Sequence, residues 1–234
     1  MTTNRPTSLL ALWTIFVTLL SVPLTAQISV HPVILDMPAT ELQRAEFEVA
    51  NSSSERVYVS IEPVRIDSAG TPVETRIAPS DPEELGLLAS PPRLIVEPGE
   101  RRFVRVAALL APGLQDRIFR VAVKPVVGDL TGEKSGLKVL VGYDLLAIQR
   151  PEAPSFTLDW QNRPEEVTIR NTGNSNGQLF NGRACQPDEA EELCTELPSG
   201  RLYAGSEMTV AKPEGTTASY DVLFMGKSTR VILE

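Results

Sequence analysis

Apolar and polar residues alternate with a period of two through most of the chain after residue 26. Phe47 and Val49 each follow a glutamate, and Val57, Val59 and Ile61 alternate with more polar neighbours. This spacing is typical of strands with one buried face. Further runs rich in β-forming residues, separated by Pro, Gly, Asp and Ser, are 93–96, 102–107, 118–127 and 137–148. Helical periodicity is weak, with at most one turn in 81–89, so the pattern predicts an all-β protein, most simply a sandwich.

A stretch with two prolines and no apolar alternation, residues 149–154, divides the strands into two groups. It predicts a stiff, extended linker. Six further strand-like runs follow it, at 156–160, 166–171, 178–183, 207–212, 219–224 and 229–233, and the glycine-rich segment 172–177 is expected to be a hairpin loop. The two groups, 27–150 and 151–234, are each close to the ~100 residues of one immunoglobulin-like sandwich. We therefore expect two tandem immunoglobulin-like β-sandwich domains.

The first 26 residues have a different character. Arg5 precedes an apolar stretch from Leu9 to Leu20, and small residues lead to Ala26. This arrangement predicts a secretory signal peptide that is cleaved after Ala26. The apolar stretch is shorter than the roughly 20 residues needed to span a bilayer. We expect a mature protein of the bacterial periplasm, with no membrane span after cleavage.

Charge and cysteine content narrow the possible functions. The chain has 30 acidic and 22 basic residues and a net charge of -8, which disfavours a nucleic-acid partner. Cys185 and Cys194 enclose a polar loop and predict a structural disulfide worth about 2–3 kcal/mol. His31 is the single histidine, so neither a zinc site nor a Ser-His-Asp triad is expected. We therefore expect neither an enzyme nor a bound cofactor.

One run departs from the alternating pattern. In 137–148 both sets of alternate positions are largely apolar, although an exposed strand of a sandwich normally has one polar face. A long apolar strand at a sheet edge can pair with another chain, as in donor-strand complementation. A central strand that is buried on both faces would show the same pattern. The pattern alone leaves both interpretations open.

Several segments between residues 28 and 151 resemble the amino-terminal domain of the PapD-like periplasmic pilus chaperones. The most specific series runs from Pro91-Pro92 through Glu97-Pro98-Gly99 to Val104-Arg105-Val106; the others are Asn51, 56–59, 115–117 and Arg150-Pro151. The resemblance implies two immunoglobulin-like domains set at an angle, with a seventh strand that lends alternate apolar residues to an incomplete pilus subunit. The second domain resembles the family only in size and strand spacing.

Counted back from Arg150-Pro151, the resemblance assigns the subunit-binding positions of this strand to Leu137, Val139, Val141 and Tyr143. It also gives Arg105 a structural role in its sheet.

Family members hold the subunit's terminal carboxylate with an Arg on the first strand and a Lys near the end of the seventh. Here the first strand, 28–35, has no Arg, and the Lys position falls on Leu146, so this mechanism cannot be transferred. Substitutes could be Arg120, Lys124, Lys138, His31 or Arg150, each expected to be a solvated surface charge.

The function expected from these observations is that of a non-enzymatic periplasmic chaperone. It would cap an incomplete pilus or surface-fibre subunit by donating an apolar edge strand, with an outer-membrane usher as a candidate second partner. The alternative is a secreted PapD-like binding or adhesive module without pilus-chaperone activity. In that case the apolar strand would be paired internally or within a homodimer.

Overall fold

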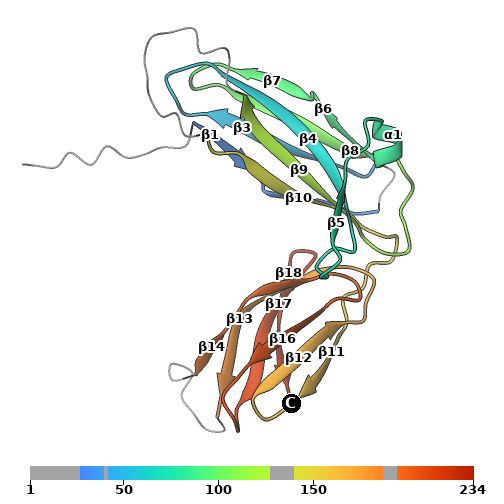
Figure 1. The fold of residues 1–234 in the computed structure, drawn as a ribbon, viewed down its shortest axis with the longest axis vertical. Coiled ribbons are helices and arrows are strands. Elements are labelled where there is room, and N and C mark those ends of the chain that lie inside the picture. The colour runs from blue at the N-terminus through green and yellow to red at the C-terminus, as the bar shows by residue number, and fades with distance from the viewer. Residues whose placement is uncertain (1–26, 40–41, 127–139, 187–193) are drawn as a thin grey trace, which may run out of the picture.

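The computed structural model describes residues 27–39, 42–126, 140–186 and 194–234. Within these ranges the chain forms two β-sandwiches that meet at an angle, and the joint lies near Arg150 (Figure 1). The prediction of an all-β chain with two tandem sandwiches is confirmed. The one helix in the described residues is the single turn α1 (Pro82–Leu85), which Asp81 caps. In the same ranges, no helix has the length and apolar character needed to cross a membrane.

The first sandwich contains two sheets. One has the order β1 (Ile28–His31), β3 (Arg44–Asn51), β8 (Arg101–Ala108), β6 (Leu87–Ser90). The other has the order β2 (Ile34–Met37), β10 (Tyr143–Gln149), β9 (Arg117–Val126), β4 (Val57–Asp67), β5 (Thr75–Ile77), and β7 (Arg93–Val96) also pairs with β4.

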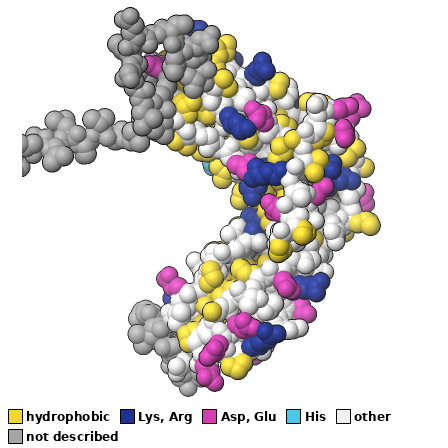
Figure 2. Space-filling model, in the orientation of Figure 1, with side chains coloured by type: hydrophobic (Ala, Val, Ile, Leu, Met, Phe, Trp, Pro, Cys, Tyr) yellow, Lys and Arg dark blue, Asp and Glu magenta, His cyan; other side chains and the backbone are white. Residues whose placement is uncertain are grey.

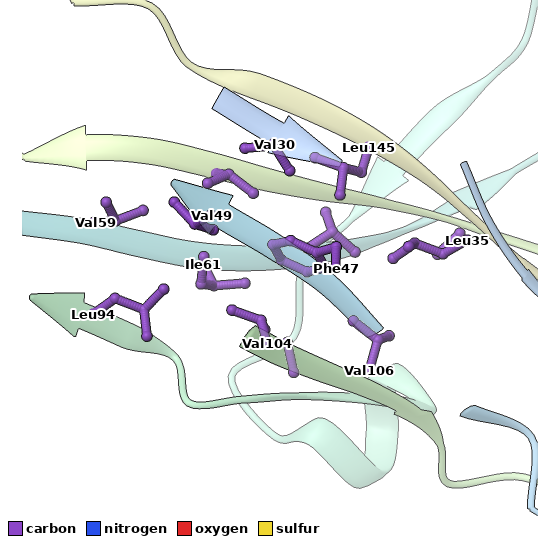
Figure 3. Close-up of a cluster of buried hydrophobic side chains, with 14 of the residues drawn as sticks. Val30, Leu35, Phe47, Val49, Val59, Ile61, Leu94, Val104, Val106 and Leu145 are labelled. Atoms are coloured by element: carbon purple, nitrogen blue, oxygen red, sulfur yellow. The ribbon is translucent and has the colours of Figure 1, made fainter. Parts of the chain in front are cut away.

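The core of this sandwich is built from the residues that the alternation predicts. Phe47 and Val49 from one sheet lie opposite Val59 and Ile61 from the other, and none is more than 3% exposed (Figure 3). Their polar neighbours along each strand point outward. The period-two pattern thus identifies the buried face of these strands.

One local prediction in this sandwich is wrong and another is confirmed. The expected first strand, 28–35, is two strands in different sheets: β1 is antiparallel to β3, and β2 is parallel to β10. Pro32 lies between them and has no N–H to donate to a continuous ladder. The helical turn expected within 81–89 is present as α1, and it is followed by β6, where Leu87 and Ala89 are buried.

The second sandwich also has two sheets. One has the order β11 (Leu158–Asn162), β12 (Glu166–Asn171), β16 (Glu207–Ala211). The other has the order β14 (Thr195–Leu197), β13 (Gly177–Cys185), β17 (Thr217–Phe224), β18 (Lys227–Leu233), and β15 (Gly200–Leu202) also pairs with β13.

Two predictions concern the ends of β13. Cys185 and Cys194 form a disulfide, as the sequence predicts. The segment 172–177 is not a hairpin loop, because β12 and β13 lie in different sheets and the chain crosses between them. This crossing loop contacts the first sandwich, so it belongs to the joint between the two sandwiches.

Candidate partner-binding surface at the inner bend

Strand β10 lies on the side of the first sandwich that faces the second (Figure 1). One edge pairs with β9 along the whole strand, from Tyr143 to Gln149. The other edge pairs with β2 only from Leu146 to Gln149. Among the described residues no strand covers this second edge at Tyr143–Leu145, which we call the open segment. A strand edge without a partner strand is a place where another chain can pair.

The predicted donor positions lie next to the open segment or outside the described residues. Leu137 and Val139 are outside them. Val141 is 46% exposed and precedes β10, because residues 140–142 are not in strand conformation. Tyr143 begins β10, packs against the core of the first sandwich, and donates its hydroxyl hydrogen to the Ile28 carbonyl oxygen at 2.9 Å. The donor roles of all four residues stay a prediction.

The second half of β10 is covered on both faces. Ala147 belongs to the core of the first sandwich, as does Leu145 at the end of the open segment. Leu146 and Ile148 face the other way and form a separate cluster with Ile66 and Ile118, against which Tyr203 of the second sandwich also packs. In this half, the two-sided apolar pattern therefore comes from burial on both faces, as the central-strand interpretation proposes.

Cross-strand register shows which residues line the outer face of this sheet. Ile148, Ile118 and Ile66 occupy one row across β10, β9 and β4. The next row crosses β2, β10, β9 and β4 and consists of Ile34, Leu146, Arg120 and Val64. Arg120 is the charged member of this row and lies directly opposite Leu146. A positive charge therefore lies one strand away from the place where the family resemblance expects a lysine.

Arg150 is buried at the joint, so its prediction as a surface charge is wrong. Its side chain is 3% exposed, and its guanidinium donates to both carboxylate oxygens of Asp36 at 2.8 and 2.9 Å. It also donates to Asp116 at 3.2 Å and to the Asn176 carbonyl oxygen at 3.0 Å. The ring of Phe224 lies 5.7 Å from the guanidinium carbon. One arginine thus connects both sandwiches.

Asp116 carries this connection into the second sandwich. Its carboxylate accepts hydrogen bonds from the Ser175 hydroxyl at 2.8 Å and from the backbone and side-chain amides of Asn176. Burial raises the pKa of Asp116, because desolvation of the charged carboxylate outweighs the opposing effect of Arg150 and these donors. Asp36, Asp116 and Asn176 could not be predicted as a group, because the apolar alternation marks none of the three.

Arg201 is a second arginine of the joint that the sequence pattern does not mark. Arg201 on β15 donates to the side-chain oxygens of Asn176 and Gln178. Burial lowers the pKa of Arg201, and the nearby guanidinium groups of Arg150 and Arg120 act in the same direction. Figure 2 shows basic side chains next to apolar ones at the inside of the bend. Within the described residues, no carboxylate forms an ion pair with Arg120 or with Arg201.

The remaining basic candidates lie elsewhere. Lys124 forms an exposed ion pair with Glu62 at 2.6 Å, and His31 is exposed on β1. Lys138 is outside the described residues. Arg105 donates to Glu46 across β8 and β3, so it links two strands at an exposed position.

The far end of the same sheet face carries an exposed row of apolar residues. Ile95, Tyr58 and Val126 are register partners across β7, β4 and β9, and they are 49%, 43% and 51% exposed. With Arg93 and Leu94 they help to line a groove of about 780 Å³. This groove is separate from the open segment of β10.

Solved structures with a similar fold were found, whereas comparisons of sequence found none. No protein-family model and no curated protein matches the sequence. Among solved structures, the class 5 fimbriae chaperone CfaA has 16% identity and a TM-score of 0.63, over 88% of this chain and 99% of that chain. The E. coli chaperone DraB has 13% identity and a TM-score of 0.62, over 88% and 95%. The Salmonella enterica SafA pilin in complex with the SafB chaperone gives 15% identity and a TM-score of 0.62, over 89% and 97%. The chain therefore has the two-sandwich fold of the PapD-like fimbrial chaperones.

Proposed function

We propose that this protein is a periplasmic chaperone that caps incomplete pilus or surface-fibre subunits by donor-strand complementation. The observation that carries the proposal is the open segment, where β10 has a partner strand on one edge and none described on the other. Extended chains add to such edges through backbone hydrogen bonds, and alternate side chains then supply specificity. Several solved structures with this fold are described as fimbrial chaperones, including SafB in complex with a pilin.

Side-chain direction supports the same mechanism. Leu145 and Ala147 point into the core of their own sandwich, and Tyr143 packs against that core from the same side. Val141 has the same parity, and the predicted donor positions Val139 and Leu137 continue it. A subunit that lacks a strand could therefore use this side of the segment to complete its own core, while the second half of β10 stays anchored in the chaperone.

We also propose the compartment and a second partner. Residues 1–26, the expected signal peptide, would direct the chain to the periplasm. An outer-membrane usher is the second partner, and the exposed row Ile95, Tyr58 and Val126 is its candidate surface. This row is apolar and solvent-exposed, and it would stay free while a subunit occupies the open segment.

The test is co-expression with a fibre subunit of the same organism, followed by measurement of the subunit recovered from the periplasm. The double variant Val139→Asp/Val141→Asp should abolish recovery, because charged side chains cannot enter an apolar groove. The matched control is Phe103→Asp, which places a carboxylate at another exposed apolar position of the same sandwich, on β8 (62% exposed). Equal recovery with the donor-strand variant and with the control would overturn strand donation.

The same open segment also permits a different function. Two copies of the chain could pair there, which would fit a secreted binding or adhesive module. Sedimentation of the purified protein separates the two possibilities. A monomer that forms a one-to-one complex with the subunit supports the chaperone. A stable dimer that Val141→Asp dissociates, without any subunit binding, supports the alternative.

A further inference from the structure

We infer that a hollow on the outer face of the first sandwich binds one aromatic side chain of the strand that pairs with the open segment. The hollow has a volume of about 340 Å³ and lies beside Tyr143 and Asp144. The inference rests on the proposed function for the source of that strand, which is a bound subunit. The pocket itself is argued from the side chains around the hollow, their charges, and its opening toward the edge of β10.

The floor of the hollow is apolar, and the register of the sheet fixes its place. Ala122 on β9 lies directly opposite Asp144 on β10 and Glu62 on β4. Its side chain is a single methyl group between two longer side chains, so space remains above it. Val64, which has the same parity as Glu62 on β4, adds an aliphatic wall. An apolar group that enters this space is removed from water, which is favourable.

Gly142 keeps the hollow open toward the edge of β10 that lacks a described partner strand. It has the same parity as Asp144, whose side chain points to the outer face, and it also borders the hollow. A Cβ atom at Gly142 would lie 3.1 Å from the carbonyl oxygen of Val123, closer than most Cβ contacts. At this point β10 therefore has no side chain between the hollow and a strand that pairs with the open segment.

Two ion pairs form the sides of the hollow. Lys124 binds Glu62 at 2.6 Å, and Arg76 binds Asp144 at 2.8 Å. Lys124 follows Ala122 on β9, on the side away from the joint, whereas Arg76 lies on β5, which pairs with the end of β4 next to the joint. The two cations thus reach the hollow from opposite ends of the strands. All four charged side chains are about half exposed, and their charges balance.

This arrangement of charges favours an aromatic side chain over a charged or an aliphatic one. Because each cation already has a carboxylate partner, a charged side chain of either sign would gain little. An aliphatic side chain would cover the floor without using the cations. An aromatic ring does both, because its face attracts an ammonium or guanidinium group and its edge is complementary to a carboxylate.

The geometry of strand pairing selects one position of the bound strand. Side chains of an added strand alternate between the two faces of the sheet, so every second one lies on the outer face. The one beside Gly142 and Asp144 is next to the hollow, and its neighbours along the strand point to the core side of the sheet. The pocket would therefore recognise one residue of the subunit and help to set the register in which its strand binds.

The direct test uses strand-forming peptides that carry Phe, cyclohexylalanine or Ala at one position, which is moved along the peptide one residue at a time. Binding to a chain that begins at Gln27 is measured by calorimetry. Cyclohexylalanine has about the size of Phe without its π face. Phe should bind about two- to fivefold more tightly than cyclohexylalanine, the effect of a cation–π contact at an exposed site, and it should do so in one parity of the peptide. Equal affinities of Phe and cyclohexylalanine at every position would overturn the aromatic pocket.

A variant that fills the hollow tests where the ring binds. Ala122→Leu puts a larger side chain on the floor, so it should remove the preference for the Phe peptide over the Ala peptide while the Ala peptide binds as before. The matched control is Ala107→Leu, at a partly exposed alanine on β8 in the other sheet, and it should leave the preference unchanged. A preference for Phe that survives Ala122→Leu would overturn the assignment of the ring to this hollow.

Removal of one cation tests the chemistry without adding bulk. Arg76→Gln should reduce the preference for Phe over cyclohexylalanine about twofold or more, and Lys124→Gln should act in the same direction. The control is Arg101→Gln, because Arg101 belongs to an exposed ion pair in the other sheet, and this variant should leave the preference unchanged. If neither Arg76→Gln nor Lys124→Gln changes the preference, the cations do not bind the ring and the inference fails.

Failure of this inference is distinct from failure of the proposed function. Val141→Asp should weaken binding of all three peptides alike, because it acts on strand addition. If the peptides bind but Phe and cyclohexylalanine are equal, the chaperone proposal stands and the pocket falls. If no peptide binds, strand donation fails, and N-acetylphenylalanine amide then tests the pocket alone. This compound should shift the NMR signals of Gly142 and Ala122 more than its cyclohexylalanine analogue does, and equal shifts would overturn the pocket as well.

Discussion

The two halves of β10 have the same apolar character and different surroundings. From Leu146 to Gln149 the strand pairs on both edges, and Ile148 is 0% exposed between the first sandwich and Tyr203 of the second. From Tyr143 to Leu145 it has one described partner strand, and just before it Val141 is 46% exposed. A continuous apolar strand is thus buried on both faces over one half and lacks a described partner strand on one edge over the other.

The two arginines that the resemblance singled out show a similar contrast. Arg150, expected at the surface, is buried and binds Asp36, Asp116 and Asn176. Arg105, expected to hold its sheet together, makes an ion pair in which both side chains are about half exposed. Burial, more than the number of ion pairs, decides how much each should contribute to stability.

The largest effect is expected from replacing Arg150, whose ion pairs lie at the joint next to the covered half of β10. Arg150→Met removes the charge that binds two carboxylates, and it leaves Asp116, 3% exposed, without its ionic partner. We expect the free energy of unfolding, measured in urea, to fall by about 3–5 kcal/mol. The control is Arg101→Met, because Arg101 is 70% exposed and pairs with Glu48 at the surface. Equal losses in the two variants would show that the joint adds little stability.

A pair of truncations within and beside β10 tests the contrast between its halves. Ile148→Ala should lower the free energy of unfolding by about 2–5 kcal/mol, because it leaves a cavity at a fully buried position. Val141→Ala should change the free energy of unfolding by less than about 0.5 kcal/mol, because Val141 is exposed. Under the proposed function, however, Val141→Ala should reduce subunit recovery. The contrast fails if Val141→Ala destabilises the isolated protein as much as Ile148→Ala does.

These contrasts also show what could be predicted from the sequence. Alternation identified the buried faces of β3 and β4, since Phe47 and Val59 each lie between polar residues that point to solvent. It could not separate the halves of β10, because contact with Tyr203, some 55 residues away in the sequence, buries the second face. Residues of the joint such as Asp116 and Arg201 lie together only after both sandwiches have folded. Local patterns carry no signal for such contacts.

Tyr143 makes a polar link between the open half of β10 and the rest of its sandwich. The Tyr143 hydroxyl donates to the Ile28 carbonyl oxygen at 2.9 Å, which connects the start of β10 to β1. Tyr143→Phe keeps the ring in the core and removes this hydrogen bond, so we expect a loss of about 0.5–1.5 kcal/mol in the free energy of unfolding. Hydrogen exchange at the amides of β1 should become faster. Unchanged exchange and unchanged stability would mean that the link does not hold the open half.

The smallest effect is expected at the exposed arginine. Arg105→Ala should lower the free energy of unfolding by at most about 1 kcal/mol, because solvent screens the pair with Glu46. A double-mutant cycle with Glu46→Ala isolates the pair, and its coupling energy should decrease as salt is added. A coupling energy as large as the cost of Arg150→Met would reverse the ranking of the two arginines. It would mean that Arg105 holds its sheet together as firmly as Arg150 holds the joint, and that exposure is a poor guide to the strength of ion pairs in this sandwich.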